Sequence, residues 1–267
     1  EAEPGIRPAV AAWLTDNGQL RLARRMQAQP PDAVAGETPA HAKLSGARVV
    51  PDDALVLPAS VRVVLVTDAA ALAEAQARAE AGGAVGVDAE WRPWGDHGSR
   101  SHGQSAVEAR RVQLLQLAWP DVVFVLDLPA LEAVAESGMQ ALLTCLVCGP
   151  VLVGYGLEGD MRRVAESYPH QACALGSWRG VELSRLSPSK GPGDGLARLC
   201  AEVLGRSLDK QLQCSDWEQR PLSDAQVRYA ALDAWALLPV FARLIASDDA
   251  HSAADWRKPY AGDVRSA

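Results

Sequence analysis

The chain has 267 residues, of which 48% are hydrophobic and 22% charged, so it can bury one sizeable core and has the composition of an ordinary globular protein. Its formal net charge of −7 argues against a protein that coats DNA regardless of sequence, because such proteins need a basic surface. A nuclease with an acidic metal pocket and a local basic rim remains open. The longest apolar runs, such as 122–126, are too short to span a bilayer, so no membrane partner is expected.

The five cysteines are odd in number and lie among apolar neighbours, which is typical of reduced thiols in an intracellular protein, cytoplasmic or nuclear. Cys145 and Cys148 have the spacing of half a zinc site. No second pair of Cys or His has the spacing to complete it, so packing within a helix is the preferred interpretation.

The first part of the chain differs in composition from the rest. A helix is predicted over 11–28, and a segment rich in Pro, Gly, Ala and Thr follows over 29–46. We therefore expect an N-terminal extension over 1–58, a folded domain over 59–247 and a C-terminal tail over 248–267.

Within the folded domain, hydrophobic patterns and capping residues predict strands over 61–66, 84–90, 112–118, 122–127, 151–155 and 181–183. Helices are predicted over 69–81, 131–147, 157–168, 196–204 and 225–246. The strands 112–118 and 122–127 flank a short turn and should form a hairpin. Early strands followed by alternating helices and strands indicate an α/β domain with a mixed sheet of five to six strands, flanked by helices.

The strand over 84–90 ends in two acids, Asp88 and Glu90, which lie on the same face because strand side chains alternate. Two like charges this close are costly unless a proton or a divalent cation lies between them. The alternative is a strand that runs out into solvated acids. The loop over 92–111 adds four arginines beside Trp91 and Trp94, and it fits either a nucleic-acid strand or a solvated insertion.

Two further acids lie in informative contexts. Asp160 follows a strand and opens a helix, at the sheet edge where ligands of open α/β sheets gather. Asp233 lies in an apolar helix with Tyr229 one turn earlier on the same face. A buried, hydrogen-bonded Tyr/Asp pair is the structural alternative for these two residues.

Taken together, Asp88-x-Glu90, the run Gly154 to Asp160, and Tyr229-x-x-x-Asp233 resemble the three motifs of the DEDD 3′–5′ exonucleases, tyrosine subtype. That subtype includes the RNase D and Werner-exonuclease branches. The runs Arg111–Leu117 and Leu208–Leu222 are also similar to segments of this family, and 88–93 with 208–210 lean toward its Nibbler-type, small-RNA-trimming branch. The resemblance covers roughly 61–246 and implies an RNase H-like exonuclease fold. The loop over 92–111 and the first 58 residues depart from it.

The resemblance implies hydrolysis of phosphodiesters from a 3′ end, assisted by two divalent cations, Mg²⁺ or Mn²⁺, about 3.5–4 Å apart. By similarity, Asp88 would contact both ions, Glu90 and Asp233 would complete the ion nearer the nucleophile, and Asp160 would hold the second. Tyr229 would orient the attacking water, because a phenol is a poor base at neutral pH.

Residues around these motifs are the predicted nucleic-acid contacts: Trp91, Arg92, Gln116, Lys210, Trp217 and Arg228. The expected substrate is the 3′ end of single-stranded RNA or DNA, with RNA favoured by the branch resemblance alone. The same branch suggests small-RNA trimming and an Argonaute-type small-RNA complex as a partner. The competing hypothesis is a catalytically silent module that binds nucleic acid or protein on the same fold.

Overall fold

The computed structural model describes residues 54–92, 111–172, 178–186, 195–246 and 260–262. The helix predicted over 11–28, the linker over 29–46 and most of the loop over 92–111 lie outside these ranges. So do Trp94 and the arginines at 100 and 110. The predictions made for these segments therefore stay predictions.

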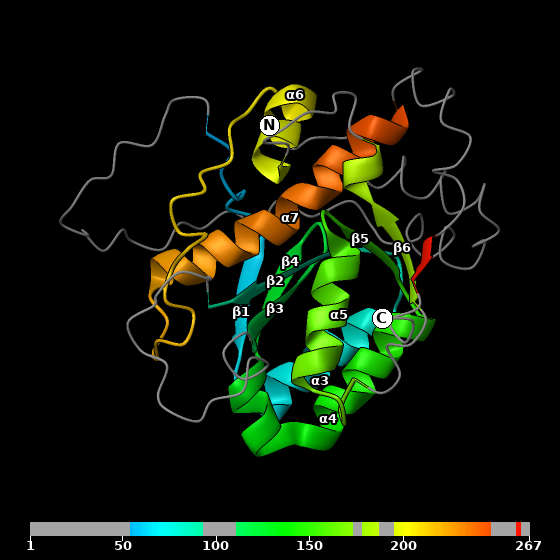
Figure 1. Ribbon diagram of the computed structural model, residues 1–267, viewed down its shortest axis with the longest axis vertical. Helices are drawn as coiled ribbons and strands as arrows, with labels where there is room; N and C mark the ends of the chain where they lie inside the picture. The colour runs from blue at the N-terminus through cyan, green and yellow to red at the C-terminus, as the bar shows by residue number, and fades with distance from the viewer. Residues whose placement is uncertain (1–53, 93–110, 173–177, 187–194, 247–259, 263–267) are drawn as a thin grey trace.

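One mixed sheet forms the centre of the fold, with the strand order β1-β4-β3-β2-β5-β6-β7 (Figure 1). Its strands are β1 (Arg62–Val66), β2 (Ala84–Trp91), β3 (Val112–Ala118), β4 (Val122–Asp127), β5 (Val151–Gly154), β6 (Trp178–Glu182) and β7 (Tyr260–Gly262). β3 runs antiparallel to both β2 and β4, which confirms the predicted hairpin, whereas β1–β4, β2–β5 and β5–β6 are parallel pairs. The mixed α/β sheet is confirmed. Six strands come from the expected folded domain, and the short β7 adds a seventh from the predicted C-terminal tail.

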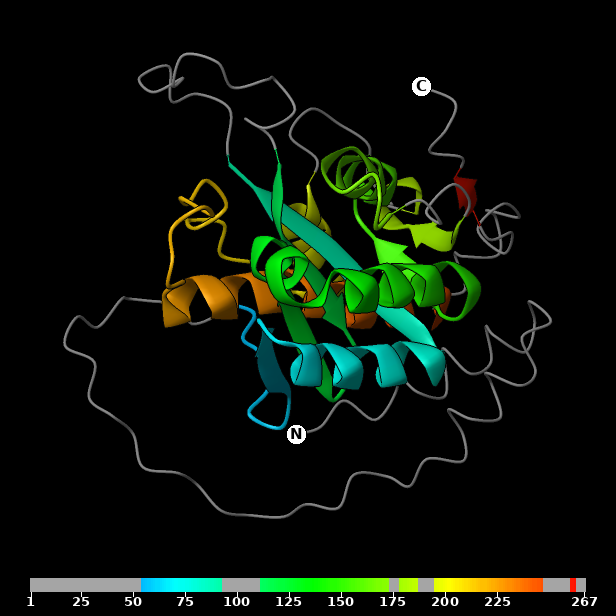
Figure 2. The same ribbon diagram turned by 90° about the horizontal axis from the view of Figure 1, so that it is seen from below.

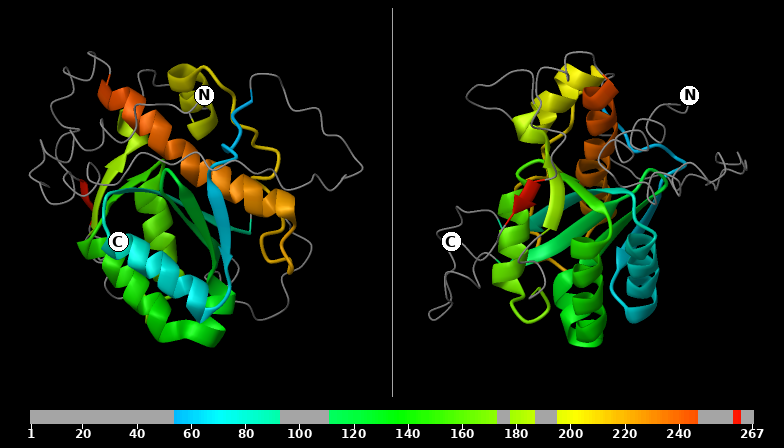
Figure 3. Two further views of the ribbon diagram at one scale, coloured as in Figure 1. Left: turned by 180° about the vertical axis from the view of Figure 1, so that it is seen from behind. Right: turned by 90° about the vertical axis from the view of Figure 1, so that its right-hand side faces the viewer.

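Two helical layers cover the sheet, and the right-hand view of Figure 3 shows the sheet between them. Helices α6 (Leu196–Leu204) and α7 (Asp224–Ala246) pack on one face, in a core that includes Leu237 and Phe241. Helices α3 (Ala69–Glu80), α4 (Leu128–Cys148) and α5 (Leu157–Ser167) cover the other face, with α3 and α4 side by side (Figure 2). β2 and β3 lie in the middle of the sheet, so the side chains of both strands are covered from both faces.

The helix boundaries follow the local sequence. Asp68 accepts hydrogen bonds from two backbone N–H groups at the start of α3, as predicted from its capping position. Asp127 caps α4 by accepting from the N–H of Ala130, which starts this helix at Leu128, three residues before its predicted start. β6 likewise begins before the predicted 181–183 strand, and Leu183–Arg185 forms a short 3-10 helix, η2.

Helix α4 is long and apolar enough over Leu128–Val147 to cross a membrane, and it is the one described helix that passes this test. The prediction that no segment has that length was therefore too strong. The helix has a kink at Ala135, and Leu131, Leu142 and Leu146 are buried in the core beneath the sheet. One side of the helix thus packs against the sheet, and 28% of the apolar window is buried inside the protein.

Candidate active site

The first half of the site is the C-terminal end of β2. Asp88 lies opposite Gln116 and Glu90 opposite Leu114 on β3, so the two acids point to the face that α7 covers. Asp88 is partly exposed, while Glu90 is buried. The prediction that the two acids share one face is confirmed.

Helix α7 supplies the second half, and a glycine sets its distance from the sheet. A Cβ at Gly86 would lie 2.3 Å from the carbonyl oxygen of Ala234, so only glycine permits this approach of the helix backbone. Asp233 is the neighbour of Ala234 and Gly86 lies two residues before Asp88. The close contact therefore brings Asp233 against the acids of β2.

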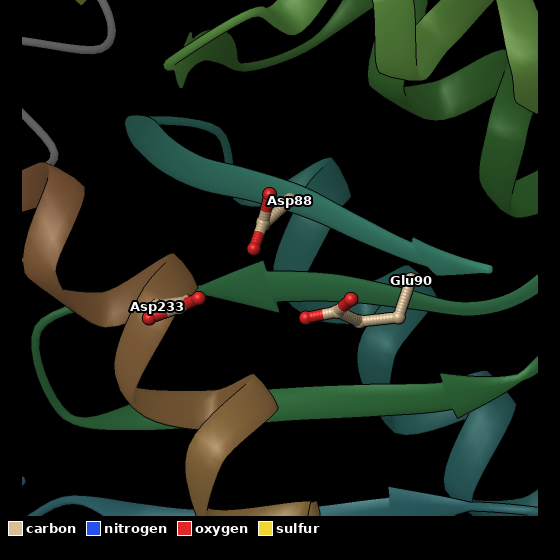
Figure 4. A group of neighbouring side chains, drawn as sticks. All are labelled: Asp88, Glu90 and Asp233. Carbon is tan, nitrogen blue, oxygen red and sulfur yellow. The ribbon is translucent and has the colours of Figure 1, made fainter. Parts of the chain in front are cut away.

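Three carboxylates converge as a result (Figure 4). One oxygen from each of Asp88, Glu90 and Asp233 lies within 4.8 Å of the other two, and no other group of three potential metal ligands occurs within the described part of the chain. Hard carboxylate oxygens in this number suit Mg²⁺ or Mn²⁺. The Oδ1 atom of Asp233 is buried without a hydrogen-bond partner, which leaves it available to a cation.

Asp160 approaches from α5 and stays outside that group. It lies in the first turn of the helix, after Gly156, which adopts a left-handed conformation with φ of 82°. The carboxylate of Glu182 fixes this turn by accepting hydrogen bonds from the N–H groups of Gly156 and Leu157, at 2.9 and 2.8 Å. Asp160 is buried and its Oδ2 atom has no hydrogen-bond partner.

Burial and mutual repulsion perturb all four carboxyl groups. Desolvation, followed by the charge of Asp233, raises the pKa of Asp88 to about 7. Desolvation, followed by the charge of Asp88, raises the pKa of Glu90 to about 10. Burial likewise raises the pKa of Asp160 and of Asp233, and the Asp88 charge adds to the effect on Asp160. A divalent cation would relieve this crowding, so the residues fit the metal that the sequence predicted.

Tyr229 lies one turn before Asp233 on α7. Its ring packs at 5.9 Å, centroid to centroid, from the buried ring of Trp217. Its hydroxyl is buried and makes no well-formed hydrogen bond, although it is close enough to Asp233 for each group to influence the other. Burial, reinforced by the Asp233 charge, raises the pKa of the Tyr229 phenol, so this group stays protonated.

The predicted nucleic-acid contacts divide into accessible and buried residues. Arg92 is partly exposed and pairs with Glu218 at 3.3 Å, and Arg228 is exposed on α7. Gln116 and Trp217 are 0% exposed, so neither offers a surface to a nucleic-acid strand. Burial therefore corrects the prediction that these two side chains contact the substrate directly.

Trp91 is partly exposed and packs under an arginine that the sequence did not single out. The Arg163 guanidinium lies 4.3 Å from the centre of the Trp91 ring, and its charge lowers the pKa of Asp160 against the larger effect of burial. Arg163 follows Asp160 by three residues, and that helical spacing was the available signal.

Lys210, which the sequence predicted as a nucleic-acid contact, pairs with an acid of the site in the metal-free protein. Its ammonium donates a hydrogen bond to Oδ2 of Asp233 at 2.8 Å, and the charges of Asp88 and Glu90 also act on it. Burial lowers the pKa of Lys210, but the charge and hydrogen bond of Asp233 together with the charges of Asp88 and Glu90 outweigh it, so this pKa is raised. Lys210 thus belongs to the acidic cluster itself.

Comparisons with known proteins identify the family and the fold. A family model described as 3′–5′ exonuclease matches residues 63–246. The chain is 36% identical over 180 residues to the human protein called exonuclease mut-7 homolog. The matched region makes up 58% of this chain but only 19% of that relative's length. Among solved structures, the EXO domain of Aedes aegypti Nibbler superposes with a TM-score of 0.57 and 24% identity, covering 72% of this chain and 90% of that one. Escherichia coli RNase D superposes with a TM-score of 0.55 and 22% identity, and the match covers 74% of this chain and 48% of the RNase D chain.

The two structural likenesses confirm the RNase H-like exonuclease fold, and the family model covers the four acids together with Tyr229. The resemblance drawn from the three motifs is thereby confirmed. The chain belongs to the 3′–5′ exonuclease family.

Proposed function

We propose that this chain is a metal-dependent exonuclease that removes nucleotides from the 3′ end of single-stranded RNA. The observation that carries the proposal is the convergence of Asp88, Glu90 and Asp233 within 4.8 Å, beside a protonated Tyr229. The family supports 3′–5′ nuclease chemistry. RNA as the preferred substrate, small-RNA trimming and an Argonaute-type partner rest on the likeness to the Nibbler branch and extend the proposal.

The four acids would share two cations between them. Asp88, Glu90 and Asp233 would hold one ion, and Asp160 together with Asp88 would hold a second, with Mg²⁺ or Mn²⁺ as the expected metals. When bound, such ions lower the pKa of water and stabilise charge on the leaving oxygen. The partial exposure of Asp88 gives solvent access to the cluster.

Tyr229 would orient water through its hydroxyl. A group whose pKa is raised above that of a free phenol donates a hydrogen bond and does not remove a proton at neutral pH. The buried Tyr229 ring packs against Trp217, with the ring centroids 5.9 Å apart. This packing next to Asp233 suits an orienting role.

For the whole chain, we propose that residues 59–247 form the exonuclease domain, with 1–58 as an extension and 248–267 as a tail. The family match over 63–246 supports these limits. Cys200 and Cys214 are free thiols, which supports an intracellular location, cytoplasmic or nuclear.

The test is a degradation assay on 5′-labelled, single-stranded RNA and DNA oligonucleotides of matched sequence, with Mg²⁺, Mn²⁺ or EDTA. We expect a ladder of products shortened from the 3′ end, faster on RNA, and no products in EDTA or with Asp88→Ala. Binding without shortening would instead support the silent module. Equal shortening by Asp88→Ala would contradict the assignment of the site.

A further inference from the structure

The segment between α6 and α7 carries a lysine that points into the acidic cluster, and this segment is firmly anchored. Trp217 is fully buried and donates a hydrogen bond from its ring nitrogen to the carbonyl of Gln213 at 3.2 Å. Arg220 donates to both carboxylate oxygens of Asp127 at the end of β4, at 2.5 and 3.0 Å. The Lys210 carbonyl joins this anchored segment by accepting a hydrogen bond from the N–H of Gln213 at 3.1 Å.

From that position, the Lys210 side chain forms an ion pair with Asp233. Its ammonium lies 2.8 Å from Oδ2 of Asp233, and the two side chains are 27% and 3% exposed respectively. The ammonium also lies 5.9 Å from the centre of the Tyr229 ring. A surface lysine that binds phosphate would extend its ammonium into solvent, whereas the Lys210 ammonium forms an ion pair with a buried acid.

The two oxygens of Asp233 are used differently. Oδ2 accepts from Lys210, and Oδ1 is buried without a partner. A buried carboxylate with no cation nearby is strongly unfavourable. In the metal-free protein, Lys210 is the one cationic side chain among the described residues that donates a hydrogen bond to an acid of the three-carboxylate group.

We infer that Lys210 is a positioning residue whose ammonium holds Asp233 in place in the metal-free site. When a metal binds, the ammonium and the metal compete for the same carboxylates. This inference rests on the proposed function for the identity of the metal, but its first half concerns the metal-free protein alone. Because the ammonium and a divalent cation stabilise the same carboxylates and repel each other, each weakens the effect of the other.

The inference makes two linked predictions for Lys210→Met. In EDTA, the Tm should fall further than in the control variant Arg198→Met, which breaks an exposed ion pair with Glu202 on α6. With saturating Mn²⁺ the Lys210→Met protein should regain most of this loss. Its affinity for Mn²⁺, measured by calorimetry, should increase by about tenfold, the effect expected from removing a like charge a few ångströms away.

Two further variants show whether the effect is one of charge and whether it acts through Asp233. Lys210→Arg keeps the charge and should retain the parent Tm in EDTA and the parent affinity for Mn²⁺. In an Asp233→Asn background, Lys210→Met should change the Tm in EDTA much less than it does in the parent. Equal losses in both backgrounds would overturn the role assigned to Lys210.

Other outcomes are equally decisive. Unchanged or weaker Mn²⁺ binding by folded Lys210→Met would overturn the opposition between lysine and metal. A Lys210→Met protein that folds only with Mn²⁺ would support it, whereas one that is unfolded in both conditions would contradict it. If the parent binds no Mn²⁺, the proposed function fails, and the comparison of Tm values in EDTA still decides the role of Lys210.

Discussion

The two sides of the acidic site are built differently. On the β2–α7 side, Asp88, Glu90 and Asp233 already lie within 4.8 Å of one another, because a backbone contact at Gly86 sets the distance between strand and helix. On the α5 side, Asp160 stands outside this group, at the start of a helix whose first turn is fixed by Glu182. The three-carboxylate group is therefore assembled without metal, whereas the second cation position that we propose would depend on the setting of α5.

The largest effect should come from removing the acid that both sides share. Asp88→Asn keeps the side-chain volume but removes the charge, and we expect the rate of RNA degradation to fall by at least about a thousandfold. The control is Glu202→Gln on α6, which should leave the rate unchanged. A residual rate within tenfold of the parent would show that Asp88 is not central to both sides.

Gly86→Ala should break the β2–α7 side alone. The new methyl group would lie 2.3 Å from the Ala234 carbonyl, so α7 must move and take Asp233 with it. We expect a destabilisation of about 1–3 kcal/mol in urea unfolding, and a larger proportional loss of nuclease activity. Gly159→Ala on α5 is the matched control, since its Cβ would meet nothing within 4 Å and alanine favours the helix. Equal behaviour of the two variants would remove the role given to the Gly86 contact.

Glu182→Gln should disturb the placement of Asp160 on α5 and leave the three carboxylates on the β2–α7 side in place. The amide replaces one of the two oxygens that receive N–H groups from Gly156 and Leu157, so the turn that carries Asp160 loses support. We expect nuclease activity to drop by about 10- to 100-fold, as for other residues that position a metal ligand. The affinity for a first Mn²⁺ ion should stay at the parent value. Loss of all Mn²⁺ binding would mean that the two sides are not separable. Glu166→Gln, on the exposed part of the same helix, serves as the control.

The smallest effect concerns stability in the absence of metal. The Asp88 pKa rises from 3.8 to about 7 and that of Glu90 from 4.5 to about 10, so the folded protein retains protons that the unfolded chain releases. The stability of the metal-free protein should therefore fall as the pH rises from about 4 to about 7, and further as Glu90 ionises.

Chemical denaturation in EDTA at several pH values measures this slope. Asp88→Asn should reduce the slope between pH 4 and 7, and Mg²⁺ should reduce it in the parent, because a bound dication favours the ionised acids. A parent protein whose stability rises over this range in EDTA would show that the acids are not crowded as described.

Local patterns in the sequence predicted much of this molecule. Apolar runs on either side of a short turn predicted β3 and β4 with their exact limits, and a strand that ends in Asp88 and Glu90 predicted two acids on one face. Both features depend on neighbours along the chain. The sequence also singled out Asp233, because an acid within an apolar helix is an unusual local feature.

Tertiary contacts account for what the sequence did not predict. Lys210 lies 23 residues before Asp233, and nothing in its own segment indicates that its ammonium turns inward to that acid. Gln116 was expected to meet the substrate, but its strand lies in the middle of the sheet, and its buried amide has no hydrogen-bond partner. The close approach at Gly86 depends on where α7 crosses β2, which no single segment encodes.

The Gly86 contact has a consequence for redesign of this nuclease. The distance between strand and helix is set by backbone atoms, so it does not vary with the side chains on the outer surface of α7. We therefore expect that exchanging an exposed residue of α7 such as Arg228, a predicted nucleic-acid contact, leaves the spacing of the three carboxylates unchanged. One helix would then carry two features that can be varied separately.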